Sequence, residues 1–440
     1  MKLKRIIAKN IYGYMNFDEK LENDVTFLIG CNGSGKTTLL NLIRAHLEPS
    51  LELLMKIDFS YVELQLVDEN NLIRVISKKN NEEKIISLTI EKGAPITRDL
   101  MLNNLSAMTV EDRQVFFEEL DVVQEIKKLD CFGYISVNRN FQYKKRRFGI
   151  IPSRFSSSKK DLSEIDVAMI HIQRLIFDRN MDISIYKSSV EEKFRSEMFK
   201  TSLLFKKNNF SSDLFGNYSL FSSWKKQLSE EKEQFYSFVT AFTKDETNYN
   251  DLFNELERIL DELINLTEDS SFDKANPPIE YYTLMLQWMI NQDNIERIDK
   301  MIALGKEFND KIEKSRKKFK IFVEILNRFF NQSGKKIKID DRGQIIATIS
   351  SCNKNVDVMN MSSGEKHLMI IFAFLMFYIK NKSIVVVDEP EISLHIGWQE
   401  IFVDSLKDAN PGVQYILATH APSIISRRER QEWCIDLSRK

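Results

Sequence analysis

Residues 30–37 read Gly-Cys-Asn-Gly-Ser-Gly-Lys-Thr and match the pattern GxxxxGK[ST] at every fixed position. Glycines in this pattern let successive backbone N–H groups turn toward phosphate oxygens, while the lysine reaches the β- and γ-phosphates and the last hydroxyl ligates Mg²⁺. An apolar run at 25–29 precedes the pattern and a helical stretch at 36–47 follows it, as a phosphate-binding loop requires. We therefore predict a nucleoside triphosphate site formed by Gly30, Asn32, Gly33, Ser34, Gly35, Lys36, Thr37 and Thr38.

Two carboxylates, Asp388 and Glu389, directly follow a second apolar run at 384–387. Taken alone, such a pair most often marks the end of a strand. With a phosphate loop in the same chain, however, the pair would lie at the carboxyl end of a buried strand beside that loop. Asp388 then fits a Mg²⁺ partner together with Thr37, and Glu389 fits the residue that polarises an attacking water.

Two further segments complete the pattern. Residues 361–365, Met-Ser-Ser-Gly-Glu, open a predicted helix, and a serine and a glycine at a helix N-terminus can bind an anion, although an isolated Ser-x-x-Glu is more often a simple N-cap. Residues 418–425, ATHAPSII, place His420 just past a predicted strand. With DEPEISLH at 388–395 and Trp398-Gln399, these segments resemble the SMC-like and RecF-like branch of the ABC ATPases, and within it the overcoming-lysogenization-defect (OLD) type. Ile396 stands where that family usually has proline.

The resemblance implies a nucleotide, ATP, and its Mg²⁺ ion. It implies that Ser362 and Gly364 complete the ATP site of a second protomer, so that the chain forms at least a head-to-tail dimer. Glu389 and His420 would then be the catalytic residues. In this family a glutamine after the third core strand contacts the metal ion and couples the nucleotide to the helical insertion. Gln142 is our candidate for this glutamine. Tyr12 or Tyr14 would either stack on adenine or pack within a strand.

These residues require an α/β fold that is split in sequence. We expect an ABC-type P-loop ATPase head with an antiparallel β subdomain and an inserted helical domain. Residues 1–150 form the N-terminal part of the head with a β meander at 61–90, residues 151–334 form the helical insertion, and residues 335–440 form the C-terminal part. Apolar heptads in the insertion persist for only about two or three repeats, which favours a compact insertion with one short helical hairpin over a long coiled coil.

Composition excludes several classes of protein. Lys and Arg total 63 against 64 Asp and Glu, so the chain is not a generally basic nucleic-acid coat protein. Its 4 cysteines form no CxxC pair, and no apolar run is long enough for a membrane span, so we expect a cytoplasmic protein without a membrane partner. The chain ends 20 residues after His420, and its 5 histidines form no HNH-like cluster, so we expect no nuclease in cis.

The chain is similar to the stand-alone ATPase subunits of the Septu and PARIS anti-phage systems. That resemblance implies a sensor or regulator, with slow ATP hydrolysis, of a separately encoded effector nuclease of the HNH or toprim type. The alternative is a RecF-like DNA repair clamp, in which the basic runs at 144–160 and 314–320 would hold DNA; a solvated helix face is the simpler interpretation of these runs. A transporter subunit is disfavoured by the LHxxWQ pattern at 394–399.

Overall fold

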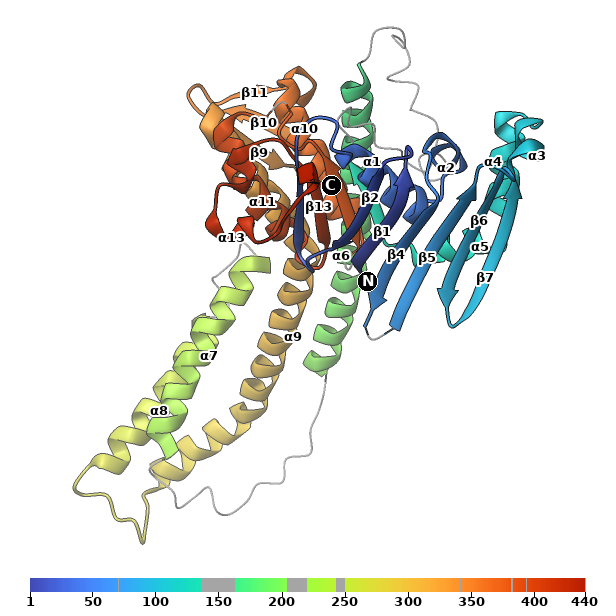
Figure 1. The fold of residues 1–440 in the computed structure, drawn as a ribbon. Helices are drawn as coiled ribbons and strands as arrows, with labels where there is room; N and C mark the ends of the chain where they lie inside the picture. Colours follow the sequence, from blue (N-terminus) through green and yellow to red (C-terminus); the bar gives the residue numbers. More distant parts are fainter. Residues whose placement is uncertain are drawn as a thin grey trace. The chain divides into compact units, whose positions relative to one another are not determined.

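The computed structural model describes residues 1–69, 71–135, 163–203, 220–242, 250–340, 342–380, 383–392 and 394–439. The chain divides into two compact units (Figure 1). Unit 1 contains Met1–Met181 and Lys318–Lys440, and unit 2 contains Asp182–Lys317. The bounds of unit 2 lie inside the insertion expected at 151–334, so one continuous segment of the chain interrupts unit 1.

A parallel sheet of five strands in the order β14-β3-β13-β12-β8 organises unit 1. Two strands come from the N-terminal half of the chain and three from the C-terminal half: β3 (Val25–Ile29), β8 (Phe132–Ile135), β12 (Ile384–Asp388), β13 (Gln414–Ala418) and β14 (Cys434–Asp436). Both faces are covered, because Val385 and Val387 enter one apolar cluster while Ile384 and Val386 enter another. Burial on both faces explains the uninterrupted apolar runs of these strands. The expected split α/β head is confirmed.

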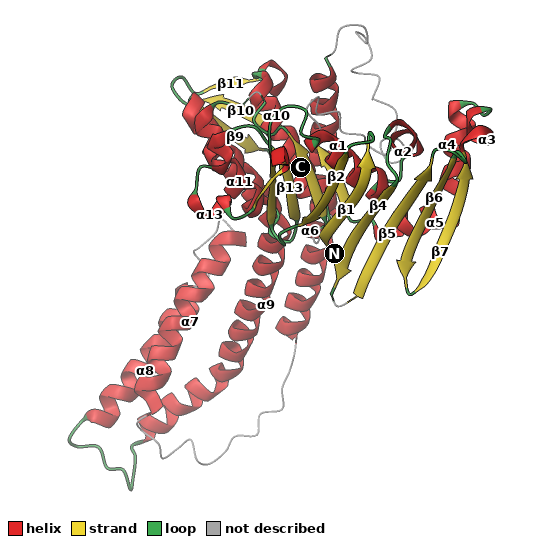
Figure 2. Ribbon diagram, viewed as in Figure 1, coloured by secondary structure: helices red, strands yellow, loops and turns green. Residues whose placement is uncertain are grey.

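An antiparallel sheet of six strands, in the order β2-β1-β4-β5-β6-β7, forms the second layer of unit 1 (Figure 2). Its strands are β1 (Lys2–Ile11), β2 (Met15–Lys20), β4 (Tyr61–Asp68), β5 (Asn71–Asn80), β6 (Ile85–Lys92) and β7 (Ala94–Met101). Successive strands from β4 to β7 pair with one another, so the predicted meander is confirmed and extended by β7, which the sequence did not indicate. This sheet is the expected antiparallel β subdomain.

Helix α1 (Lys36–Leu47) lies between the two sheets, where it contacts β8, β12 and β13 of the parallel sheet and β4 of the antiparallel sheet. Its side chains Leu39, Leu40 and Ile43 are fully buried there. The other described helices before β8 are α2 (Leu51–Lys56), α3 (Leu102–Ser106), α4 (Val110–Glu119) and α5 (Asp121–Leu129). The sequence pattern at 110–129 predicts a single helix. The structure has two helices there instead, because Leu120 adopts an extended conformation with φ −62° and ψ 133°.

The C-terminal half of unit 1 begins with a small antiparallel sheet of β9 (Lys335–Ile339), β10 (Ile345–Ile349) and β11 (Lys354–Val356). The alternating residues at 336–339 and 345–349 predict a hairpin, and the structure confirms it, with Ile339 opposite Ile345. The elements that follow are η4 (Val358–Asn360), α10 (Ser363–Ala373), η5 (Phe374–Tyr378), α11 (Ile396–Ala409), α12 (Pro422–Ile425), α13 (Arg428–Gln431) and η6 (Leu437–Arg439). Helix α10 leads through η5 to β12, so the chain connects the serine-glycine segment to the paired carboxylates.

Four helices are described in the middle of the chain: α6 (Glu164–Leu203), α7 (Leu220–Phe242), α8 (Asn250–Glu268) and α9 (Ile279–Phe330). In unit 2, α7, α8 and α9 share an apolar core in which the rings of Trp224 and Trp288 stack with centroids 5.6 Å apart. Helix α9 has 52 residues and is about 78 Å long at 1.5 Å per residue. The expectation of a short helical hairpin was therefore wrong about helix length. No helix in the described part of the chain is long and apolar enough to span a membrane.

Candidate active site

The loop between β3 and α1 has the backbone conformation that its glycines predict. Gly33 and Gly35 have φ values of 82° and 89°, in the left-handed region that L side chains rarely adopt. A Cβ atom on Gly35 would also lie 2.8 Å from Cζ of Phe17, whereas a Cβ atom on Gly33 would meet nothing within 4 Å. Gly35 is thus required both by its backbone and by its packing against β2.

Lys36 is the first residue of α1, and its side chain folds back over this loop. Its Nζ donates hydrogen bonds to the carbonyl oxygens of Gly30 at 2.8 Å and Cys31 at 3.0 Å. Burial lowers the pKa of Lys36, and the nearby carboxylates of Glu389, Asp388 and Glu391 oppose that shift. The ammonium group is therefore held at the mouth of the loop by neutral carbonyl oxygens, which the charged oxygens of a phosphate can replace.

The carboxyl ends of β3, β13 and β12 lie side by side, because Leu28 pairs with Ala418 and Ala418 pairs with Asp388. Asp388 is buried, and the hydroxyl of Thr37 donates a hydrogen bond to its carboxylate. The Oδ1 atom of Asp388 has no hydrogen-bond partner among the described residues. Burial, and then the charge of Glu389, raise the pKa of Asp388 to about 6. A buried carboxylate with an unpartnered oxygen beside a hydroxyl is the oxygen donor set that fits Mg²⁺.

Glu389 follows Asp388 at the edge of the same sheet and is half-buried. Its φ of 48° is unusual for a residue other than glycine, and such backbone strain concentrates at functional sites. The N–H group of Glu389 donates to the carbonyl of Ala418 at 2.9 Å, so the turn after β12 is fixed to the end of β13. His420 lies two residues after Ala418, the last residue of β13, and its side chain is exposed. The structure therefore brings Lys36, Thr37, Asp388, Glu389 and His420 to one edge of one sheet.

Ser362 and Gly364 lie elsewhere, at the N-terminus of α10. The Ser362 hydroxyl accepts from the N–H group of Glu365, and the Glu365 carboxylate accepts from the N–H group of Ser362 at 3.0 Å, which makes a capping box. Lys335 donates to both oxygens of this carboxylate, at 2.9 and 2.8 Å. In the described part of the chain, the hydrogen bonds of Ser362 stay within the first turn of α10 and do not reach the loop of Lys36.

The other sequence-based candidates have mixed outcomes. Gln142 lies outside the described residues, so its role stays a prediction. Tyr12 and Tyr14 are 46% and 72% exposed in the turn between β1 and β2, so packing within a strand, the simpler interpretation, is wrong for both. The described residues contain no group of three or more His, Cys, Asp or Glu side chains arranged to hold a metal ion.

Sequence reasoning assigned no role to two residues of this edge. Glu391 accepts hydrogen bonds from the hydroxyl of Thr419 at 2.9 Å and from the N–H group of His420 at 2.7 Å. The hydroxyl of Ser438, in η6, accepts from the N–H group of Cys31 at 3.0 Å. Glu391 stood within a matched motif string, which was a signal of its importance. Ser438 carried no such signal, because its contact spans almost the whole chain.

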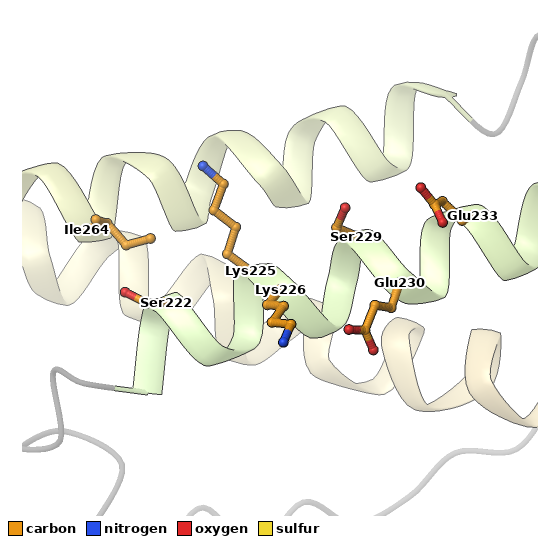
Figure 3. A pocket seen from close by; sticks show the side chains of 7 residues that line it. All are labelled: Ser222, Lys225, Lys226, Ser229, Glu230, Glu233 and Ile264. Carbon is orange, nitrogen blue, oxygen red and sulfur yellow. The ribbon is translucent and has the colours of Figure 1, made fainter.

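A separate groove of 430 Å³ lies in unit 2, between α7 and α8 (Figure 3). It is lined by six polar or charged residues of α7, among them Lys226, Glu230 and Glu233, and by Ile264 of α8. Lys225 at its wall forms an ion pair with Asp261 of α8. This open, mixed-charge surface lacks the convergent polar groups on an apolar wall that mark most small-molecule sites.

Comparison with known proteins gives a family that covers nearly all of this chain. The family described as AAA ATPase domain matches residues 1–425. The chain is also similar to the Retron Vc95 probable ATPase of Vibrio cholerae serotype O1 biovar El Tor, with 26% identity over 197 residues, 41% of this chain and 37% of that protein. The Retron Ec83 probable ATPase of Escherichia coli is 20% identical over 157 residues, 29% of each chain. The matched regions thus span only 37% of the first relative and 29% of the second.

Among solved structures, the SMC head domain from Thermotoga maritima matches with a TM-score of 0.41 and 10% identity, over 97% of this chain and 92% of that one. The Smc head domain of Pyrococcus furiosus, with an extended coiled coil and bound to the C-terminal domain of ScpA, matches with a TM-score of 0.38 and 13% identity, over 97% and 91% of the two chains. These TM-scores are too low to establish a fold, which is shown instead by the strand order described above.

Proposed function

The chain belongs to the AAA ATPase domain family, and from that premise we propose that it binds ATP with Mg²⁺ and hydrolyses it slowly. The observation that carries this proposal is the edge formed by β3, β13 and β12. There the phosphate loop, the hydrogen bond between Thr37 and Asp388, and the side chains of Glu389 and His420 meet. No other part of the described chain combines a phosphate-binding backbone with carboxylates and a histidine.

Each residue of this edge has a task in the proposed reaction. Lys36 exchanges its loop carbonyls for oxygens of the β- and γ-phosphates, and the N–H groups of residues 33–37 surround those phosphates. Thr37 and Asp388 would hold Mg²⁺, which when bound neutralises phosphate charge. Glu389 orients the attacking water and accepts its proton, and His420 donates a hydrogen bond to the γ-phosphate.

The proposal includes a second copy of the chain. Ser362 and Gly364 lie at a helix N-terminus outside the loop of Lys36, and a helix N-terminus favours phosphate. In a head-to-tail dimer, this helix end of one protomer closes the ATP site of its partner. Dimerisation would then depend on ATP, and slow hydrolysis would set the lifetime of the dimer.

We further propose that the chain regulates a separately encoded effector nuclease, of the HNH or toprim type, in anti-phage defence in the cytoplasm. Support comes from the two relatives, which are named as retron ATPases, and from the OLD-like motif string at 388–399. The ATP-dependent dimer would hold or release the effector. DNA repair by a RecF-like clamp is the competing function; of its two basic runs, 144–160 lies outside the described residues and 314–320 is mostly exposed on α9.

Hydrolysis and assembly are tested together on the full chain. Phosphate release is measured for the wild type, Glu389→Gln and Lys36→Ala, and mass is measured by light scattering with and without ATP. Glu389→Gln should release phosphate at least about a hundredfold more slowly because its general base is lost, while still forming an ATP-dependent dimer. Lys36→Ala should neither bind ATP nor dimerise. A wild type that releases no phosphate, or whose mass ignores ATP in all three proteins, would refute the proposal.

The effector is tested by purifying the chain at native levels, with and without Glu389→Gln and ATP. Recovery of a second protein in the ATP-bound assembly supports the defence function and identifies the effector. Recovery of a dimer that carries DNA alone, and loses it when salt is raised, would instead favour the repair clamp.

A further inference from the structure

Glu391 lies in the turn after β12, two residues beyond Glu389, and both of its carboxylate oxygens are bound by the loop after β13. Oε2 accepts from the hydroxyl of Thr419 at 2.9 Å, and Oε1 accepts from the N–H group of His420 at 2.7 Å. Hydrogen bonds to an ionised acceptor are about twice as strong as neutral ones. A single carboxylate therefore joins the turn that carries Glu389 to the residue proposed to contact the γ-phosphate.

Further hydrogen bonds hold the backbone of the loop around His420. The hydroxyl of Thr419 accepts from the N–H group of Ala421 at 3.0 Å, so its own proton is directed to Glu391. The N–H group of Thr419 donates to the carbonyl of Leu28 at 3.2 Å, and Thr419 is only 1% exposed. Three consecutive N–H groups, at 419, 420 and 421, thus have fixed acceptors, while the imidazole of His420 remains exposed.

A second bridge holds the other side of the same turn. Gln399, in the first turns of α11, donates to the carbonyl of Leu394 at 2.7 Å, and the hydroxyl of Ser423 in α12 donates to Gln399. The turn after β12 is therefore fixed to α11, and α11 is fixed to the segment that follows His420. The turn that carries Glu391 is therefore itself fixed, so the Glu391 carboxylate can define the position of His420.

We propose that Glu391 is a positioning residue for His420: its carboxylate fixes the backbone of His420 relative to Glu389, so that both act on one γ-phosphate. This inference rests on the proposed function, in which His420 takes part in ATP hydrolysis. Because Glu389 donates to Ala418 and Glu391 accepts from Thr419 and His420, the two loops form one unit. Catalytic groups must be held to within a fraction of an ångström, and a displacement of about 1 Å can cost about a hundredfold in rate.

The kinetic test is a cycle of Glu391→Ala, His420→Ala and the double variant in the full chain, with MgATP as substrate. Glu391→Ala should lower kcat by about tenfold to a hundredfold and leave KM within about twofold. If Glu391 acts through His420, the double variant should be no slower than His420→Ala alone. If the kcat of the double variant falls by the product of the two single losses, Glu391 acts on the reaction directly and the inference is overturned. Thr419→Val should lower kcat, whereas Thr419→Ser, which keeps the hydroxyl, should retain the wild-type rate.

Hydrogen exchange at residues 418–423, followed by mass spectrometry, tests the same inference without ATPase activity. Exchange there should be faster in Glu391→Ala than in the wild type, and unchanged in Glu400→Ala, which removes an exposed carboxylate of α11. Equal exchange in Glu391→Ala and the wild type would overturn the inference, even if the wild type hydrolyses ATP. Faster exchange in a chain whose wild type hydrolyses no ATP would overturn the proposed function alone, because Glu391 would still hold His420.

Discussion

His46 makes the stability of unit 1 depend on pH. It lies in α1, is fully buried, and its Nδ1 is 2.7 Å from the carbonyl oxygen of Leu42 while its Nε2 is 2.6 Å from the hydroxyl of Ser77. A carbonyl only accepts, so Nδ1 carries the proton and Nε2 accepts from Ser77 in the neutral ring. Burial lowers the pKa of His46 from 6.5 to about 4. The folded state therefore holds His46 neutral at a pH where the unfolded state charges it.

The sign and size of the effect follow from this shift. The stabilisation is complete above the unfolded pKa of 6.5 and is lost as pH falls from 6.5 toward the folded value of about 4. Linkage gives a loss in the free energy of unfolding of about 2 kcal/mol between pH 7.5 and pH 5, and of about 3 kcal/mol once the pH is below 4. His46→Gln removes the titration, so the variant should lack this part of the pH dependence.

The assay is urea unfolding of the wild type and His46→Gln at a series of pH values from 7.5 to 5. Fluorescence of Trp398 and Trp433 reports on unit 1 when Trp224 and Trp288 of unit 2 are replaced by phenylalanine in both proteins. Taking the difference between the free energies of unfolding of the two proteins at each pH cancels the contribution of the carboxylates that both contain. A difference that changes by less than about 0.5 kcal/mol over this range, or that changes in the opposite direction, would refute the assignment of a buried neutral imidazole.

Three further stability predictions concern the surroundings of the site, each measured as a change in the free energy of unfolding by urea. Gly33→Ala should cost about 1 kcal/mol for its left-handed backbone, and Gly35→Ala about 1–3 kcal/mol more because its Cβ atom also clashes; equal costs would contradict the packing argument. Lys335→Met should cost about 1–3 kcal/mol by leaving the buried Glu365 without its cation, and the double change with Glu365→Gln should recover part of that loss, which an unpaired role for Lys335 would not allow. Trp398→Phe should cost about 1–3 kcal/mol by leaving a buried carbonyl of α9 without its donor, and a neutral result would contradict that hydrogen bond.

Local signals in the sequence predicted several elements to the residue. The bounds of β3 and α1 are those expected from the apolar run at 25–29 and the helical stretch at 36–47. Strand β13 has the bounds of the strand predicted at 414–418, just before His420. Local pattern could not show that Leu120 breaks the helix expected at 110–129, since its side chain fits either conformation. It also missed β7, whose side chains are nearly all exposed and so do not alternate. Apolar alternation reveals a strand only where one face is buried.

The length of α9 could not be predicted because its buried face changes partners along the helix. Tyr281 and Met285 belong to the core of unit 2, whereas Phe322 and Phe329 belong to a cluster of unit 1. A heptad count assumes one continuous partner, so it fails where the partner changes. The phosphate loop and paired carboxylates were recognisable because their chemistry is contiguous in sequence. Glu391 could not be assigned a role, because its partners lie 28 and 29 positions away.

The capping box of α10 bears on how a second protomer would use Ser362. In the single chain, the Ser362 hydroxyl donates to Oε2 of Glu365 at 3.0 Å and accepts from the N–H group of Glu365. To donate to a phosphate in the proposed dimer, the hydroxyl has to leave Oε2 of Glu365. Lys335 keeps that carboxylate paired through both oxygens, and hydrogen bonds from Lys335 and Ser362 lower the pKa of Glu365 although burial alone would raise it. When Ser362 turns outward, Lys335 still compensates the buried charge of Glu365. The free-energy cost of breaking the hydrogen bond from Ser362 to Oε2 of Glu365 is therefore small.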